Sequence, residues 1–139
     1  MTDGAGARDE RDLESGMSFQ PRFDANGLVP AVVTDETTGE VLMLAYMNRE
    51  ALDQTIATRY ATFWSRSRNR IWIKGEESGN RLAVTALLTD CDQDTVWIKA
   101  RIEGDGVACH TGAKSCFYRA VDLDASVPHH VVLKRARQA

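Results

Sequence analysis

Short runs rich in β-branched and aromatic residues follow one another along most of the chain, separated by Gly, Ser, Asn or Asp turns. Such runs are typical of strands, and the turns between them leave little room for long helices. We therefore expect an α+β domain made mostly of an antiparallel β-sheet with one main helix. The predicted strands are residues 28–34, 41–47, 62–65, 71–74, 82–88, 95–102 and 117–121.

The clearest local prediction is a hairpin followed by the helix. Residues 35–40 join the first two runs, and Gly39 is expected to supply a positive φ in that turn. Asn48 has the short polar side chain of an N-cap, and helical spacing continues from it to about Tyr60. One face of this helix, which we expect to pack on the sheet, carries Leu52, Thr55 and Ile56.

The length of 139 residues suits a single domain. Residues 1–18 are Gly-rich, charged and nearly free of large apolar groups, so we expect a disordered leader rather than a signal peptide. The domain is expected over residues 19–128, and residues 129–139 are expected to form a basic tail that frays from Val131. No run approaches the roughly 20 apolar residues that span a bilayer, so we expect a cytoplasmic protein without a membrane partner.

The three cysteines, Cys91, Cys109 and Cys116, lie in polar segments rather than in apolar runs. Carboxylates, hydroxyls, glycine and a histidine surround them, and such neighbours suit metal ligation. Three thiolates leave the fourth position of a tetrahedral zinc ion open, as in hydrolytic sites. We expect a zinc ion here, although composition alone would favour three unrelated reduced thiols.

Asp90, Asp92 and Asp94 alternate around Cys91. In an extended segment the three carboxylates would point to one side and the thiol to the other. Oxygen ligands suit Mg²⁺, whereas thiolates select zinc, so we expect Mg²⁺ at the carboxylates. The alternative is a surface turn in which aspartate caps backbone amides. If Cys91 faces away from this loop, its zinc partners can belong to another chain, and the sequence leaves that question open.

The stretch from Arg59 to Arg81 is strongly basic, and its acids are Glu76 and Glu77. Its serines are compact donors, and Gly79 allows the backbone to approach an anion closely. We expect substrate phosphate to bind here, in preference to a strand face that carries arginine only for solubility. The candidate substrate contacts are Ser65, Arg66, Arg68, Lys74 and Ser78.

His110 directly follows Cys109. Because imidazole titrates near neutral pH, this residue suits three roles: a fourth zinc ligand, a general acid or base, or a hydrogen-bond donor beside the metal. We expect the acid–base role. His129 and His130 stand beside Pro128 and are expected in an exposed loop.

Four segments together resemble phosphoribosyl-AMP cyclohydrolase of histidine biosynthesis. They occur in that family's order within residues 28–120: residues 64–68 (WSRSR), 72–80 (WIKGEESGN), 90–94 (DCDQD) and 109–117 (CHTGAKSCF). The sequence departs from the pattern at Ala113, where a basic residue is expected; Lys114 beside it is the expected substitute in contacting substrate.

The resemblance implies a zinc-dependent hydrolase that opens the adenine ring of 1-(5-phosphoribosyl)-AMP between N1 and C6, giving the phosphoribosyl-formimino-AICAR ribotide. It implies a cytoplasmic homodimer, which we expect to be intertwined. It also implies a zinc ion held by Cys109 and Cys116 with Cys91 from the other subunit, and Mg²⁺ at Asp90, Asp92 and Asp94, with one ion of each kind per subunit. His110 is assigned the proton at N1.

Two rival interpretations are weaker. A zinc-stabilised module for RNA or a nucleotide effector would use the same basic stretch, but Cys-x2-Cys pairs are missing, and the net charge of -3 and the aspartates disfavour a nucleic-acid partner. A zinc nucleoside deaminase would need His-x-Glu and Pro-Cys-x-x-Cys segments, and the sequence has neither.

Overall fold

The structure, a computed structural model, describes residues 14–136. The expected leader over residues 1–18 therefore lies mostly outside the described residues. The main helix is α2 (Arg49–Thr58). The strands are β1 (Val29–Asp35), β2 (Val41–Met47), β3 (Thr62–Ser65), β4 (Arg70–Ile73), β5 (Leu82–Thr89), β6 (Val96–Ile102), β7 (Arg119–Val121) and β8 (Leu133–Arg135). The predicted strands thus all occur, and their ends shift by at most two residues.

Six strands form one sheet in the order β4-β3-β2-β1-β6-β5. The hairpins β1–β2, β3–β4 and β5–β6 are antiparallel, as the short turns between them require. The prediction of a mostly antiparallel sheet is confirmed, with one parallel pair, β1 and β6. Because β2, α2 and three further strands separate β1 from β6 in the chain, the chain is long enough to return in the same direction.

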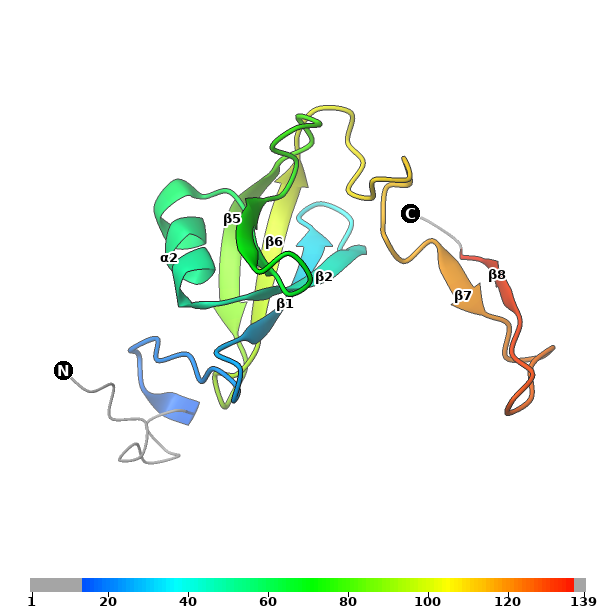
Figure 1. Ribbon diagram of the computed structural model, residues 1–139, viewed down its shortest axis with the longest axis horizontal. Helices are drawn as coiled ribbons and strands as arrows, with labels where there is room; N and C mark the ends of the chain where they lie inside the picture. The colour runs from blue at the N-terminus through cyan, green and yellow to red at the C-terminus, as the bar shows by residue number, and fades with distance from the viewer. Residues whose placement is uncertain (1–13, 137–139) are drawn as a thin grey trace.

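The helix α2 covers one face of the sheet (Figure 1). Asn48 is its N-cap, as predicted, and accepts a hydrogen bond from the backbone N–H of Ala51 at 2.9 Å. Leu52 and Thr55 are buried, but Ile56 is 49% exposed, so its predicted place on the packed face is wrong. The buried stripe instead contains Ala51, which rotates the packed face away from Ile56.

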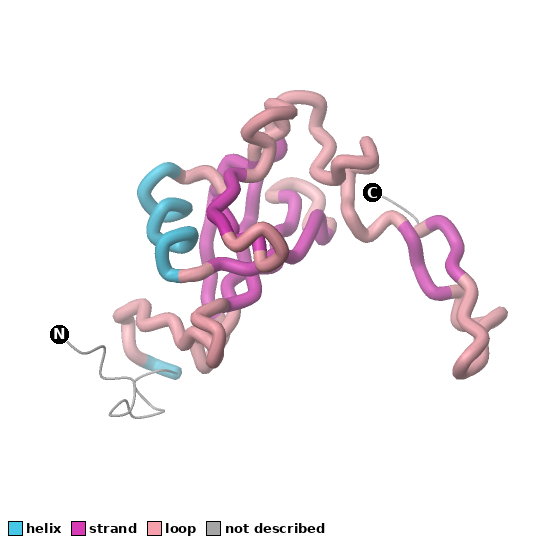
Figure 2. The backbone as a smooth tube through the Cα atoms, viewed as in Figure 1, coloured by secondary structure: helices cyan, strands magenta, loops and turns pink. Residues whose placement is uncertain are grey.

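The hydrophobic core lies between α2 and the sheet. It contains Leu52 from the helix, Val29, Ala31 and Val33 from β1, and Ile98 from β6. These β1 side chains are at every second position of the strand, so they share one of its faces. The opposite sheet face, which we call the open face, has no helix over it among the described residues (Figure 2).

The last described segment, residues 119–136, forms a hairpin that we call the arm. Its strands β7 and β8 pair with each other and form a separate sheet. The prediction that the chain frays from Val131 is therefore wrong for β8, because strand pairing orders it. A long loop links β6 to the arm, which stands away from the six-stranded sheet (Figure 1 and Figure 2).

Candidate active site

Residues 108–118, which we call the cysteine loop, fold back on themselves and attach to β2. The backbone N–H of Ala108 donates to Lys114 O at 2.9 Å, which closes the loop between Cys109 and Cys116. The Cys116 N–H donates to Leu42 O at 2.7 Å. The Ser115 hydroxyl, on a side chain that is 1% exposed, donates to Val41 O at 2.7 Å. These bonds place both cysteines at the start of β2.

A second attachment of the loop is an ion-pair cluster. Lys114 Nζ lies 3.3 Å from Asp35 Oδ2 and 3.2 Å from Glu40 Oε1. Burial raises the pKa of Asp35, but hydrogen bonds from Thr37, Thr38 and Lys114 hold that pKa below its usual value. Lys114 thus binds the β1–β2 turn, and its expected role in contacting substrate is not supported by this geometry.

The thiols of Cys109 and Cys116 are close enough to form a hydrogen bond with each other. The Thr111 hydroxyl donates to Cys109 Sγ at 3.0 Å. Burial raises the pKa of Cys109, but the Thr111 and Cys116 hydrogen bonds and the charge of Lys74 bring that pKa below its usual value. Burial and the Cys109 charge raise the pKa of Cys116. One thiol of the pair is therefore prepared to ionise, as a metal ligand must.

Cys91 lies apart from these two cysteines. It follows β5, whereas Cys116 is bonded to β2, three strands away in the sheet order. Three inter-strand spacings amount to about 14 Å, and each thiolate of a zinc site lies about 2.3 Å from the ion. Within residues 14–136, the aspartates below are the one group of three or more His, Cys, Asp or Glu near enough to share an ion. One chain therefore joins two of the three predicted zinc ligands, and all three cysteines are free thiols.

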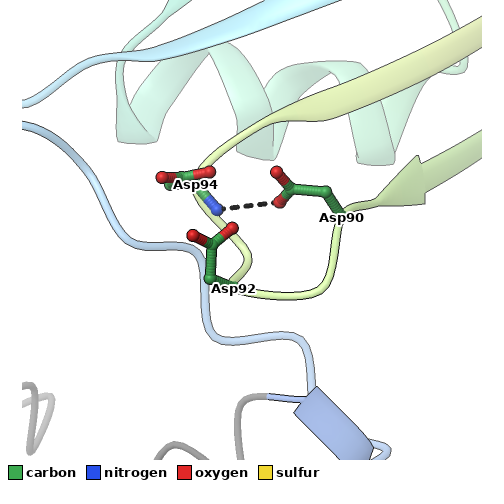
Figure 3. Close-up of side chains that lie close together, drawn as sticks. All are labelled: Asp90, Asp92 and Asp94. Carbon is green, nitrogen blue, oxygen red and sulfur yellow. Dashed lines mark hydrogen bonds between the residues drawn. The ribbon is translucent and has the colours of Figure 1, made fainter.

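The carboxylates of Asp90, Asp92 and Asp94, the aspartate cluster, meet at the end of the β5–β6 hairpin, with ligand oxygens within 4.8 Å of one another (Figure 3). The segment is a turn, so the extended alternation that the sequence allowed does not occur, and the alternative of a surface turn describes the backbone. Gln93 is buried with a φ of 59°, and its backbone carbonyl accepts from Arg22 N at 2.7 Å. Because Gln93 points inward, the turn brings its neighbouring aspartates together.

Repulsion between the carboxylates of the aspartate cluster affects the pKa of one of them. Burial and the hydrogen bonds and charges of Asp90 and Asp92 raise the pKa of Asp94. The Asp90 carboxylate also caps the turn, because it accepts from the backbone N–H groups of Asp94 at 3.1 Å and Thr95 at 3.3 Å. Both interpretations of these residues, a backbone cap and a cluster suited to a cation, therefore describe the same turn.

The predicted phosphate contacts Ser65, Arg68 and Ser78 line one pocket of about 400 Å³ at the β3–β4 hairpin, which we call the basic pocket. Arg70 and Trp72 also line it, together with the acids Glu76 and Glu77. Strand pairing explains part of this gathering, because Ser65 is directly opposite Arg70.

Two predicted contacts lie outside the basic pocket. The Arg66 guanidinium stacks 4.0 Å above the Tyr46 ring and lines a neighbouring hollow with Trp64. Lys74, at the end of β4, is near enough to the cysteine pair for its charge to lower the pKa of Cys109. It therefore connects the basic pocket with the cysteine loop. His110 is exposed in the turn after Cys109.

The loop that closes the basic pocket is held by Asn80. Its side-chain oxygen accepts from the Asp105 N–H at 2.7 Å. Gly75 has a φ of 79°, and a Cβ there would lie 2.2 Å from the Asn80 backbone. A Cβ at Gly104 would lie 2.3 Å from the Asn80 side chain. Both glycines allow the loop to pack against the turn that leads to the cysteine loop.

Sequence reasoning did not select Arg70, Tyr46 or Ser115 as site residues. Arg70 is the first residue of β4 and lies opposite Ser65. The predicted strand began at residue 71, so Arg70 fell outside it. Tyr46 and Ser115 carry no local signal, because their partners Arg66 and Val41 are distant in sequence.

Comparisons with known proteins agree with these elements. The family model described as phosphoribosyl-AMP cyclohydrolase matches residues 43–118. The chain is similar to proteins named phosphoribosyl-AMP cyclohydrolase. The one from Brucella anthropi is 58% identical over 113 residues, which are 81% of this chain and 80% of that protein. The one from Brucella canis is 56% identical over 113 residues, which are 81% of this chain and 81% of that protein. The protein of that name from Sinorhizobium fredii is 53% identical over 124 residues, 89% of this chain and 82% of its own. The chain therefore belongs to the phosphoribosyl-AMP cyclohydrolase family.

Proposed function

We propose that this chain is the phosphoribosyl-AMP cyclohydrolase of histidine biosynthesis, a cytoplasmic hydrolase that opens the adenine ring of 1-(5-phosphoribosyl)-AMP between N1 and C6. The observation that carries the proposal is the neighbourhood of the cysteine pair, Lys74 and the basic pocket. Ionisable thiols suit a hydrolytic metal, and the guanidinium groups of the basic pocket suit phosphate.

The donor set fits zinc. Cys109 and Cys116 sit on a loop that is attached to β2, and Thr111 and Lys74 favour the thiolate form of Cys109. A third thiolate, Cys91 of a second copy, would complete the set, which makes the enzyme a homodimer with shared zinc sites. Bound zinc supplies Lewis-acid chemistry that makes water nucleophilic near neutral pH.

The aspartate cluster fits Mg²⁺. Its oxygens lie within 4.8 Å of one another, and repulsion raises the pKa of Asp94, so a divalent cation would relieve an unfavourable interaction. Mg²⁺ prefers such oxygen ligands and often keeps waters that reach substrate phosphates. Asp90, Asp92 and Asp94 would hold the ion.

The substrate carries two phosphate groups, and the chain offers two neighbouring hollows that suit them. Arg68, Ser65 and Ser78 would bind one phosphate in the basic pocket, with Arg70 as a further donor. Arg66, held over Tyr46, would contact the second arm of the substrate. Lys74 would orient the ring toward the cysteine loop.

Ring opening also needs a proton. Water adds at C6, the N1–C6 bond breaks, and N1 gains a hydrogen as its leaving electron pair is protonated. His110 adjoins Cys109 and is exposed, so we assign it the delivery of this proton to N1.

A mixing experiment tests the shared site. The Cys91→Ala and Cys109→Ala variants should each lack ring-opening activity, measured by ultraviolet absorbance. Random exchange of subunits should restore about a quarter of wild-type activity, because half of the dimers are mixed and each mixed dimer has one complete site. Either variant exchanged with itself is the control. Full activity in both single variants would contradict the thiolate site.

A substrate-binding test uses Arg68→Ala. Loss of a bidentate phosphate contact should raise KM while leaving kcat nearly unchanged. Arg49→Ala, at the start of α2 and outside both hollows, is the matched control. An unchanged KM for Arg68→Ala would remove phosphate binding from the basic pocket.

A further inference from the structure

Residues 20–22, which we call the clamp, are bonded to the turn that carries the aspartate cluster, and Gln93 makes both bonds. The side-chain oxygen Oε1 of Gln93 accepts a hydrogen bond from the backbone N–H of Gln20 at 2.7 Å. The backbone carbonyl of Gln93 accepts from the N–H of Arg22, also at 2.7 Å. Pro21 stands between these two donors, has no N–H of its own and is buried. Each end of the clamp is therefore held by the same residue of the turn.

The backbone conformation of Gln93 depends on contacts of this kind. Its φ of 59° lies in the left-handed region, which side chains other than Gly, Asn and Asp rarely adopt. Such a conformation persists only where the surrounding structure fixes it. Gln93 is 4% exposed, so little water competes for its hydrogen bonds to the clamp. These two bonds therefore stabilise the inward-pointing conformation of Gln93.

The conformation of Gln93 in turn sets the direction of its neighbours in the turn. Asp92 and Asp94 directly flank it, and the Gln93 N–H donates to Asp90 O at 3.1 Å. With Gln93 turned inward, ligand oxygens of the three carboxylates come within 4.8 Å of one another, although like charges repel. The clamp is outside the aspartate cluster, and its hydrogen bonds oppose this repulsion by holding the turn in place.

We propose that Gln93 is a positioning residue: by bonding to the clamp, it keeps the carboxylates of the aspartate cluster in the arrangement that binds Mg²⁺. The inference rests on the magnesium site proposed above, and it adds Gln93 and the N-terminal clamp as supports that lie outside the ligand set. Loss of a group that orients metal ligands typically lowers metal affinity about 10- to 100-fold. A single substitution at Gln93 should therefore change the affinity of the site for a divalent cation.

Binding of Mn²⁺ to the zinc-loaded, full-length protein tests this role. Mn²⁺ suits the same carboxylate ligands, its free form is measured by electron paramagnetic resonance, and added Mg²⁺ should displace it. Gln93→Met keeps the length of the side chain but removes the acceptor of the Gln20 N–H. Its dissociation constant for Mn²⁺ should rise about tenfold. Because the measurement is made on folded protein well below Tm, a purely structural role would leave this constant unchanged.

A second variant and a control accompany Gln93→Met. Gln20→Pro removes the same hydrogen bond from the clamp side and leaves the turn sequence intact, so its dissociation constant should rise about threefold or more. Thr55→Val is the matched control: Thr55 is 0% exposed on α2, and its hydroxyl donates to Ala51 O at 2.9 Å. It also loses a buried hydrogen bond, but its affinity for Mn²⁺ should stay within about twofold of wild type. Circular dichroism checks that each variant is folded.

The Mg²⁺ dependence of ring opening gives a second readout. Because Gln93 acts through the ion, the Mg²⁺ concentration for half-maximal activity of Gln93→Met should rise about tenfold. At saturating Mg²⁺, kcat should return to within about threefold of wild type, since the filled site is the same.

Asp92→Ala separates this inference from the proposed function. If Asp92→Ala loses Mn²⁺ binding while Gln93→Met and Gln20→Pro bind Mn²⁺ as tightly as wild type, the magnesium site stands and the role of Gln93 is overturned. Equal weakening by Thr55→Val would also overturn that role. If Asp92→Ala and wild type bind Mn²⁺ equally, the aspartates do not form the site and both proposals fall. Weaker binding by both clamp variants, with kcat recovered at high Mg²⁺, would support both.

Discussion

The Ser115→Ala substitution should loosen the cysteine loop without touching a metal ligand. The Ser115 side chain is 1% exposed; its hydroxyl donates to Val41 O at 2.7 Å and accepts from the Phe117 N–H at 2.9 Å. Removing it leaves two backbone groups without that partner. A buried group left unsatisfied costs about 1–3 kcal/mol, and since Phe117 is exposed, water can replace its bond. We therefore expect a total loss of about 2 kcal/mol.

Thermal unfolding in the presence of a chelator measures this loss without a contribution from metal. For 139 residues, an unfolding entropy of about 2.1 cal/mol/K per residue converts 2 kcal/mol into a fall in Tm of about 7 °C. Zinc affinity should also fall, because Cys109 and Cys116 lose part of the attachment that holds them together. Ser67→Ala, an exposed serine whose hydroxyl contacts Ser65 at 3.4 Å, is the control and should change Tm little.

One result would refute the reasoning about Ser115. If Ser115→Ala melts within about 2 °C of wild type and binds zinc with the same affinity, then its hydroxyl does not hold the loop on β2. A fall in Tm with unchanged zinc affinity would limit the role of Ser115 to stability.

Three further predictions concern the other parts of the site. Gly75→Ala should destabilise the fold more than Gly27→Ala. The two glycines have similar φ values of 79° and 76°, but only a Cβ at Gly75 would meet backbone, at 2.2 Å. Urea unfolding should show a loss of about 1 kcal/mol for Gly27→Ala and a larger loss for Gly75→Ala, and equal losses would contradict the packing. Lys114→Met should cost about 1 kcal/mol at pH 7. Since the pKa of Asp35 is lowered from 3.8, the ion pair stabilises above that value, and the difference from wild type should vanish as the pH falls through the folded pKa; a difference that persists in strong acid would be against it. Because the pKa of Asp94 is raised from 3.8, the metal-free protein should lose stability as the pH rises through the folded pKa of Asp94. Mg²⁺ should therefore raise Tm at pH 7.5 but not at pH 3. No effect of Mg²⁺ on Tm at either pH would contradict the cation site.

Much of the fold follows from local sequence patterns. The β-branched runs and their turns predicted the strands, Gly39 adopts the expected positive φ of 77°, and Asn48 caps α2. These features depend on interactions between residues close in sequence, so the sequence carries them directly. The placement of Ile56 was wrong because helical spacing leaves the exact direction of the packed face to tertiary contacts.

The site residues divide in the same way. The aspartate cluster was predicted as a group, but for a partly wrong reason, since the buried Gln93 in a turn, rather than strand alternation, brings the carboxylates together. The basic pocket was predicted in part: Ser65, Arg68 and Ser78 share it, whereas Arg66 lies in a separate hollow.

The sequence by itself determined the chemistry of this protein: which thiols, carboxylates and guanidinium groups are available, and the α+β class that carries them. Only the tertiary structure decided which of them meet. The parallel pairing of β1 with β6 fixes the sheet order, and that order places β1 and β6 between the strand that Cys91 follows and the strand to which Cys116 is bonded. Strand order depends on contacts between residues far apart in the chain, and no local periodicity encodes such contacts.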